Sequence, residues 1–188
     1  GMFCVPKYSN PNGVTYSDDV VLALASLKPA AEDFRVIWDN AYIIHELTDS
    51  PDSLLNIFEA CKKYGTEDYF VEFTSTSKIS FPGAGVSALA ASDKNIAEIK
   101  KRLNFQTISY DKLNQLRHVK YFRNVDGIKK HMAKHAKIIA PKFRLVLDML
   151  EKEIAPIGIG KWVKAKGGYF ISFDTVGCSA KRIGELCK

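Results

Sequence analysis

The chain has 188 residues, of which 27 are Lys or Arg and 21 are Asp or Glu, so its formal net charge is +6. Hydrophobic residues make up 46% and aromatic residues 11% of the sequence, which excludes an intrinsically disordered chain. The longest apolar runs, such as residues 83–91, are too short for a membrane-spanning helix, which needs ~20 residues. Met2 leads straight into Phe-Cys-Val-Pro and a polar turn, so we expect no signal peptide, and Gly1 has the position of a residue left by a tag.

The first two thirds of the chain alternate between strand and helix patterns. Turn signals at Asn10-Pro11 and Asn12-Gly13 follow the first strand, and a continuous apolar run predicts a buried second strand. In chain order, the predicted elements are a strand at 3–5, a helix from Ser17 or Asp18 to Leu27, a strand at 34–39, a helix at 53–64, strands at 68–74 and 83–91, and a helix at 93–103.

This alternation predicts an α/β fold with a mostly parallel sheet and flanking helices. In such sheets a ligand binds outside the carboxyl ends of the strands. That rule directs attention to Asn10, Asp39 and residues 75–78, which follow the predicted strands.

The last third of the chain has a different pattern. Apolar residues at helical spacing predict one long helix over 126–153, and Pro141 inside it should kink or break it near residues 137–140. The glycines at 158–160 and 167–168 read as flexible joints. A strand at 169–173 and a helix at 179–187 complete the prediction, which indicates a second, smaller domain.

Four cysteines lie far apart in the sequence and form no C-x-x-C pair: Cys4, Cys61, Cys178 and Cys187. This spacing argues against a zinc site and against a disulfide framework, and it favours a reducing, cytoplasmic setting. We expect no metal ligand set and no membrane partner. The basic excess permits nucleic-acid binding, but the basic residues are scattered, so charge alone decides nothing.

Three polar residues at strand ends have two interpretations each. Lys78 follows four small hydroxyl residues and is either an ordinary loop lysine or a sheltered amine that reacts with a carbonyl group. Asp39 either caps the next turn or pairs with a buried cation. Asn10 reads as a turn residue when it is taken alone.

The combination and order of these residues resemble the pyridoxal-phosphate-dependent aminotransferases of fold type I. Residues 38–42, 73–86, 111–118 and 167–172 are similar to the bacterial aspartate-aminotransferase-like subgroup. The resemblance covers nearly the whole chain, which looks like a central-to-C-terminal fragment. It implies part of the large cofactor-binding domain over residues 2–125. Residues 126–188 would then hold an interdomain helix and part of the small C-terminal domain.

The resemblance also implies a role for each candidate residue. Lys78 would bond to the aldehyde of pyridoxal 5'-phosphate and then carry a proton as general base and acid. Asp39 would pair with the pyridine nitrogen, and Asn10 and Tyr42 would hydrogen-bond the phenolic oxygen. Ser75 would contact the phosphate.

One departure concerns the phosphate. Many relatives carry an arginine shortly after the Pro-Gly pair, whereas residues 82–86 hold no basic residue. The backbone N–H groups of Gly83 and Gly85 are an alternative partner for the anion. The arginine that grips the substrate carboxylate in the family also has no counterpart before Lys188.

The expected activity is amino-group transfer between an amino acid, first of all aspartate, and a 2-oxo acid. The alternatives are another pyridoxal-phosphate reaction of the same fold, such as decarboxylation or elimination, and a basic nucleic-acid-binding module. We expect the 188 residues alone to bind the cofactor weakly or not at all. We also expect them to self-associate, for example as a homodimer, because apolar sheet faces would stay uncovered.

Other residues are expected to have ordinary structural roles. His45 reads as a packing residue, and the basic face of the long helix, Lys130 to Lys137 with His131 and His135, reads as a solvated surface. Gln115 and Arg117 either line the substrate region or subunit interface or lie on a surface helix.

Overall fold

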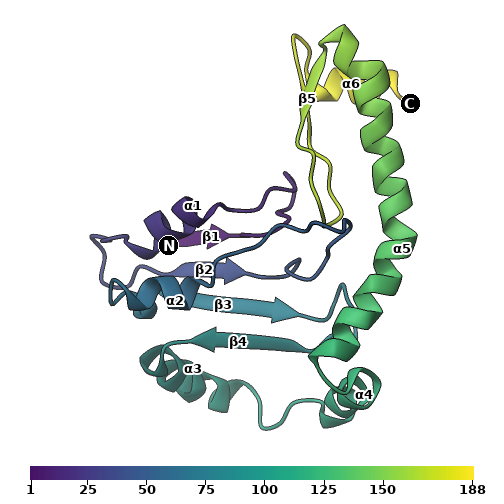
Figure 1. Ribbon diagram of the computed structural model, residues 1–188. Helices are drawn as coiled ribbons and strands as arrows, with labels where there is room; N and C mark the ends of the chain where they lie inside the picture. The colour runs from purple at the N-terminus through teal and green to yellow at the C-terminus, as the bar shows by residue number, and fades with distance from the viewer.

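The computed structural model describes residues 1–188 and confirms the α/β class. Four strands form one sheet in the order β1 (Met2–Cys4), β2 (Val36–Asp39), β3 (Phe70–Ser75) and β4 (Ser87–Ala91) (Figure 1). β1, β2 and β3 pair in parallel, whereas β4 pairs antiparallel to β3. The sheet is therefore mixed, and the strand predicted over 83–91 begins four residues later because residues 76–86 form the loop that reverses the chain.

Two helices cover one face of this sheet, α1 (Asp18–Ala25) and α2 (Ile57–Lys62). Ser17 caps α1 as predicted, since its side chain accepts from the Val20 N–H, whereas α2 begins only after the Asn56 cap. The main core lies between the sheet and these helices: Cys4, Val21, Ala25, Val36, Trp38, Ile57, Ala60, Cys61 and Phe70.

The opposite face of the sheet carries no helix of this chain. Side chains alternate along a strand, so Ile37 and Asp39 point away from the face that buries Val36 and Trp38. On this open face Phe3 is 65% exposed. The site described below lies at the edge of the same face.

The remaining elements follow the sheet. A 3₁₀ turn at Glu67–Tyr69 precedes β3, and α3 (Asp93–Gln106) and α4 (Lys112–Phe122) lie beyond β4, at the lower edge in Figure 1. The long helix α5 (Val125–Met149) continues as a π-helical turn (Leu150–Ile154) and a 3₁₀ turn (Ala155–Ile157). The hairpin of β5 (Gly160–Trp162) and β6 (Phe173–Thr175) and then α6 (Ala180–Leu186) end the chain.

The long helix is not broken at Pro141. It runs without interruption from Val125 to Met149, so the predicted break near residues 137–140 is wrong. Pro141 is exposed, and the carbonyl group of Lys137 that loses its helical partner can therefore reach water. None of the helices combines the length and the apolar character that crossing a membrane would require.

The glycine pair at 167–168 is a packing contact. A Cβ atom on Gly167 would lie 2.4 Å from both the His45 carbonyl oxygen and the Tyr8 ring. Gly168 has a φ of +77°, and a Cβ atom there would lie 2.9 Å from Tyr8 Cβ. The Gly168 N–H donates to the His45 carbonyl at 2.8 Å. The pair therefore brings two distant segments together, and the prediction of a flexible joint there is wrong.

The predicted strand at 169–173 is also wrong for most of its length. Only Phe173 belongs to β6, which pairs antiparallel with β5. Tyr169 and Phe170 instead pack against a buried cluster of Tyr8, Ala41 and Tyr42. Aromatic side chains favour a strand and a core contact alike, so the local pattern did not separate the two.

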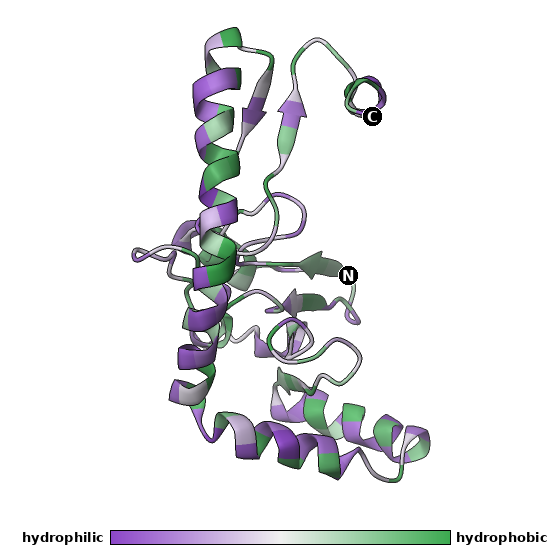
Figure 2. Cartoon of the chain, turned by 90° about the vertical axis from the view of Figure 1, so that its right-hand side faces the viewer, coloured by the Kyte–Doolittle hydropathy of each residue, from purple (hydrophilic) through white to green (hydrophobic).

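The chain exposes much more surface than a compact protein of its size. Its accessible area is 12729 Å², against about 9,000 Å² expected for a compact chain of this length. Hydrophobic positions recur along α5 and the two helices below it (Figure 2). Ile108, Leu113 and Val119 are among the large apolar side chains that are more than half exposed.

Candidate active site

The carboxyl ends of β2 and β3 lie at one edge of the sheet. The two strands pair in parallel with Asp39 opposite Phe73, so Asp39 and Ser75 end neighbouring strands on the same side. Both side chains line a hollow of about 430 Å³ on the open face, which we call the Asp39 hollow. Apolar side chains complete most of its wall: Phe3, Ile37 and Phe73.

One oxygen of the Asp39 carboxylate has a local role. Oδ1 accepts a hydrogen bond from the Ala41 N–H at 3.0 Å, which is the capping interaction that the sequence left open. The other oxygen makes no hydrogen bond or ion pair within the chain. Asp39 therefore keeps one free anionic oxygen at the strand end, inside the Asp39 hollow.

Lys78 lies on the turn after β3. The N–H groups of Ile79 and Ser80 both donate to the Thr76 carbonyl, which places Lys78 at the tip of this turn. Its Nζ is 4.7 Å from the centroid of the Tyr42 ring and forms no ion pair. A cation over an aromatic face is attracted by the ring quadrupole, so the amine is held near Tyr42 and stays free to react.

Tyr42 comes from the segment after β2 and is only 5% exposed. Its ring meets the rings of His45, Tyr169 and Phe170 edge-on at 5.8–6.3 Å. Its hydroxyl group makes no hydrogen bond within the chain. The structure thus brings Tyr42 and Lys78 together, at the sheet edge that also carries Asp39.

Asn10 lies in the turn that follows β1. It is exposed in the turn closed by the Gly13 N–H and the Ser9 carbonyl, and no hydrogen bond joins its side chain to Asp39, Tyr42 or Lys78. The turn itself packs against the C-terminal segment, because a Cβ atom on Gly13 would meet Ala165 at 2.7 Å. In this chain Asn10 has the turn role that its local sequence predicts.

Three side chains that sequence reasoning left out contact the backbone of Lys78 and its neighbour. His45 Nε2 lies 3.2 Å and the Tyr169 hydroxyl 3.3 Å from the Lys78 carbonyl oxygen. His131 Nε2 lies 2.8 Å from the Ile79 carbonyl oxygen. These residues are 33, 91 and 52 positions away from their partners, so no local pattern could have found them.

The predicted solvated face of α5 is therefore wrong for its two histidines. Lys130, Lys134 and Lys137 are exposed, but His131 and His135 turn toward the Lys78 turn and Tyr169. Burial lowers the pKa of His135 and of His45, and it raises the pKa of Tyr169. The side chains that contact the Lys78 turn from these segments are therefore aromatic and imidazole rings.

The segment after Lys78 is an exposed turn with two backbone N–H groups that have no partner in the chain. The N–H groups of Gly83 and Gly85 make no hydrogen bond within the chain, and Gly83 has a φ of +77°. A Cβ atom on Gly85 would lie 2.6 Å from Ser77 Oγ, so only glycine fits there. Asn114 of α4 holds the turn by donating to the Ala84 carbonyl at 2.9 Å.

The two helix residues that were left open lie on α4. Gln115 is exposed, as a surface helix predicts. Arg117 lines a hollow of about 540 Å³ together with Phe81, His118 and His131. His118 Nε2 lies 2.7 Å from Ser80 Oγ, so α4 also contacts the Lys78 turn.

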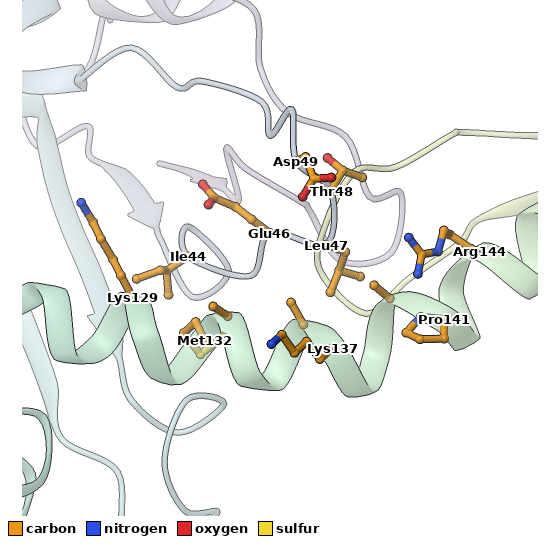
Figure 3. A pocket seen from close by; sticks show the side chains of 13 residues that line it. Ile44, Glu46, Leu47, Thr48, Asp49, Lys129, Met132, Lys137, Pro141 and Arg144 are labelled. Atoms are coloured by element: carbon orange, nitrogen blue, oxygen red, sulfur yellow. The ribbon is translucent and has the colours of Figure 1, made fainter.

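A further hollow of about 480 Å³ lies between the loop at residues 44–49 and α5. Ile44 of the loop lies near Met132 and Lys129 of the helix, whereas Leu47 lies farther along the helix, on the side of Arg144 (Figure 3). None of the five candidate residues lines it. The chemistry-bearing side chains therefore belong to the Asp39 hollow and the adjoining Lys78 turn. No group of three or more His, Cys, Asp or Glu side chains is arranged to hold a metal ion.

The chain is similar to known proteins in sequence and in fold. The family model described as aspartate amino-transferase matches residues 1–188. An aminotransferase of Mycolicibacterium smegmatis is 45% identical, and an aspartate aminotransferase of Corynebacterium glutamicum 43% identical, each over all 188 residues. The chain spans 44% of the length of these two curated relatives.

Solved structures of aminotransferases have a similar fold. An aspartate transaminase from Corynebacterium glutamicum has a TM-score of 0.93 at 42% identity, over 98% of this chain and 44% of that one. An α-aminoadipate aminotransferase of Thermus thermophilus, complexed with N-(5'-phosphopyridoxyl)-L-leucine, has a TM-score of 0.74 at 19% identity, which shows the fold alone. It covers 95% of this chain and 44% of that one. Because the family model matches it from end to end, the chain belongs to the aspartate aminotransferase family.

Proposed function

We propose that this chain supplies the lysine-bearing part of an aminotransferase that moves an amino group between aspartate and a 2-oxo acid with pyridoxal phosphate. The observation that carries the proposal is the position of the Lys78 amine. It is free of ion pairs and lies over Tyr42, at the sheet edge where Asp39 ends β2. Membership of the family, whose members use pyridoxal phosphate, supports the cofactor.

The residues present fit this cofactor. The Asp39 hollow offers a free carboxylate oxygen for a protonated ring nitrogen and the Ser75 hydroxyl for a phosphate oxygen. The Tyr42 hydroxyl is free to donate to the phenolic oxygen, with Asn10 as the second donor. The unpaired N–H groups of Gly83 and Gly85 are donors that suit an anion where no arginine follows the Pro-Gly pair.

When bound, pyridoxal phosphate supplies an electron sink for the electron pair left at the substrate α-carbon. The protein's part is to place groups around it. Asp39 would pair with the ring nitrogen and favour its protonated form, and the Lys78 amine would bind the cofactor and serve as the base and acid that moves a proton at the substrate α-carbon. The aromatic cluster around Tyr42 excludes water from one side of the amine.

Covalent labelling tests this assignment directly. The protein is incubated with pyridoxal phosphate, reduced with borohydride and mapped by mass spectrometry. We expect the pyridoxyl group on Lys78, its loss in Lys78→Ala, and its retention in Lys161→Ala, a matched control because Lys161 is exposed on β5. A label that stays when Lys78 is replaced would overturn the assignment.

The type of reaction needs a separate assay, since these residues serve the cofactor and do not select the bond that breaks. Amino transfer from aspartate to 2-oxoglutarate should exceed release of CO₂ from the same amino acid. The reverse ratio would favour the decarboxylase alternative. The family match gives no support to a nucleic-acid-binding module.

We further propose that the chain works in a homodimer, with the boundary between the two domains at residues 125–126. The exposed area of 12729 Å² and the apolar side chains of α4, such as Leu113 and Leu116, support an association that covers them. Leu116→Lys should shift the protein toward the monomer in sedimentation. An unchanged sedimentation coefficient would refute a dimer through α4.

A cytoplasmic location is supported by the cysteines. All four thiols are free, and Cys4 and Cys61 are buried in the core. Burial raises the pKa of both thiols, so they stay unreactive. Thiol titration of protein from unlysed cells should find all four reduced, whereas an extracellular protein would carry oxidised Cys178 or Cys187.

A further inference from the structure

Two side chains from distant parts of the chain meet at the carbonyl oxygen of Lys78, and a third lies behind one of them. His45, on the segment after β2, places Nε2 at 3.2 Å, and Tyr169, after the glycine pair, places its hydroxyl at 3.3 Å. His135 of α5 lies behind Tyr169, with Nε2 at 3.4 Å from the hydroxyl oxygen.

The direction of each hydrogen bond follows from the carbonyl group. A carbonyl oxygen only accepts, so His45 must carry its proton on Nε2 and the Tyr169 hydroxyl must donate. The Tyr169 oxygen is then free to accept from His135 Nε2. The resulting order is His135 to Tyr169 to the Lys78 carbonyl, with His45 donating to the same carbonyl from another side.

The surroundings of His45 favour this tautomer. The side chain is 2% exposed, and its Nδ1 is buried with no hydrogen-bond partner. A nitrogen without a proton can be buried in this way at a lower cost than an N–H group that has no acceptor. Burial is the largest cause that lowers the pKa of His45, and the charges of His135 and Lys78 act in the same direction, whereas hydrogen bonds with the backbone of Lys78 and Tyr42 act against them. The contact with the Lys78 carbonyl oxygen makes Nε2 the donor of the ring.

The backbone of His45 is held as firmly as its ring. Its carbonyl accepts from the Gly168 N–H at 2.8 Å, and Leu47 and Lys166 form a second hydrogen bond across the same pair of segments at 3.0 Å. The same pairing carries Tyr169, which follows Gly168. His45 and Tyr169 therefore approach the Lys78 carbonyl as one unit.

We propose that His45 and Tyr169 are positioning residues for Lys78, which by donating to its carbonyl oxygen fix the backbone from which the amine projects. The inference rests on the proposed function of Lys78. A lysine side chain has four flexible methylene groups, so the place of its amine depends on how firmly its backbone is anchored. A shift of about 1 Å at a reacting group can cost up to about 100-fold in rate.

The two residues can be tested by removing each donor while keeping its shape. Tyr169→Phe deletes one hydroxyl and keeps the ring against Tyr42. His45→Leu deletes the Nε2 donor, whereas His45→Gln keeps a donor at the same distance from the backbone. Tyr64→Phe is the matched control, because Tyr64 is exposed near the end of α2 and its hydroxyl contacts nothing in the chain.

Two readouts are measured on the intact protein. The first, without cofactor, is amide hydrogen exchange of the peptide that carries Ile79 and Ser80, which should be about fivefold faster in Tyr169→Phe and His45→Leu for the loss of one hydrogen bond. The second is the rate at which pyridoxal phosphate attaches to Lys78, measured as the amount of pyridoxyl-Lys78 trapped by borohydride at successive times. This rate should fall about tenfold in both variants. His45→Gln and Tyr64→Phe should stay within about twofold of the parent in both measurements.

The outcomes separate this inference from the proposed function. If pyridoxal phosphate attaches in the parent to a lysine other than Lys78, the proposed function is wrong, and the exchange measurement still decides whether the backbone is held. If both variants exchange and attach at the parent rate, the positioning roles are wrong and the assignment of Lys78 stands. If His45→Gln is as slow as His45→Leu, His45 acts by packing alone, which refutes its role as a donor.

Discussion

Replacing Gly167 by alanine should separate the two segments that carry His45 and Tyr169. The added Cβ atom would lie 2.4 Å from the His45 carbonyl oxygen and 2.4 Å from Tyr8 Cε2, about 1 Å closer than ordinary contact. Neither the His45 carbonyl nor the Tyr8 ring can move away easily. The carbonyl is bonded to Gly168, and Tyr8 is fully buried with its hydroxyl accepting from the Asp52 N–H at 3.3 Å.

The expected cost is that of overpacking, about 1–3 kcal/mol in the free energy of unfolding. With a urea dependence of about 2 kcal/mol per molar, the unfolding midpoint should fall by roughly 0.5–1.5 M. The matched control is Gly184→Ala, since Gly184 lies in α6 with nothing within 4 Å of its Cβ position. Alanine there should leave stability unchanged or raise it by up to about 1 kcal/mol.

Urea unfolding followed by tryptophan fluorescence measures both variants, and Trp38 in the core reports the sheet. Equal midpoints for Gly167→Ala and Gly184→Ala would refute the tight contact between the segments. It would also remove the structural basis for holding His45 and Tyr169 as one unit.

Three further outcomes follow from buried groups. Trp38→Ala, at a side chain 1% exposed between Tyr16 and Phe70, should lower the free energy of unfolding by about 3–5 kcal/mol in urea titration. Thr66→Val removes the buried hydroxyl that donates to the Ala25 carbonyl at 2.6 Å, and it should lower the free energy of unfolding by about 1–2 kcal/mol in the same assay. Ser26→Ala removes an exposed hydrogen bond and should lower it by less. Because burial lowers the pKa of His45 in the folded chain, the unfolded chain takes up a proton first as the pH falls below about 6.5. Stability should therefore be complete above that pH and decline below it, and His45→Gln should decline less between pH 7.5 and 5.5.

Sequence patterns were sufficient where the structure depends on nearby residues. The apolar run at 34–39 predicted β2, and the polar residue before α1 is the cap that the structure has. Asp39 and Lys78 fall at the same edge of the sheet because parallel strands present their carboxyl ends together. This much of the candidate site follows from strand order and from the position of each residue after its strand.

Tertiary contacts decided the rest. β4 runs antiparallel because the loop at 76–86 reverses the chain. Tyr169 lies outside β6 because its ring packs edge-on against Tyr42. The histidines of α5 turn inward because the helix passes beside the Lys78 turn (Figure 1). Nothing in the sequence around His45 or Tyr169 marks them as neighbours of Lys78, since they lie 33 and 91 residues away. Local patterns record the preferences of neighbouring residues, whereas a hydrogen bond between distant segments depends on packing that only the folded chain defines.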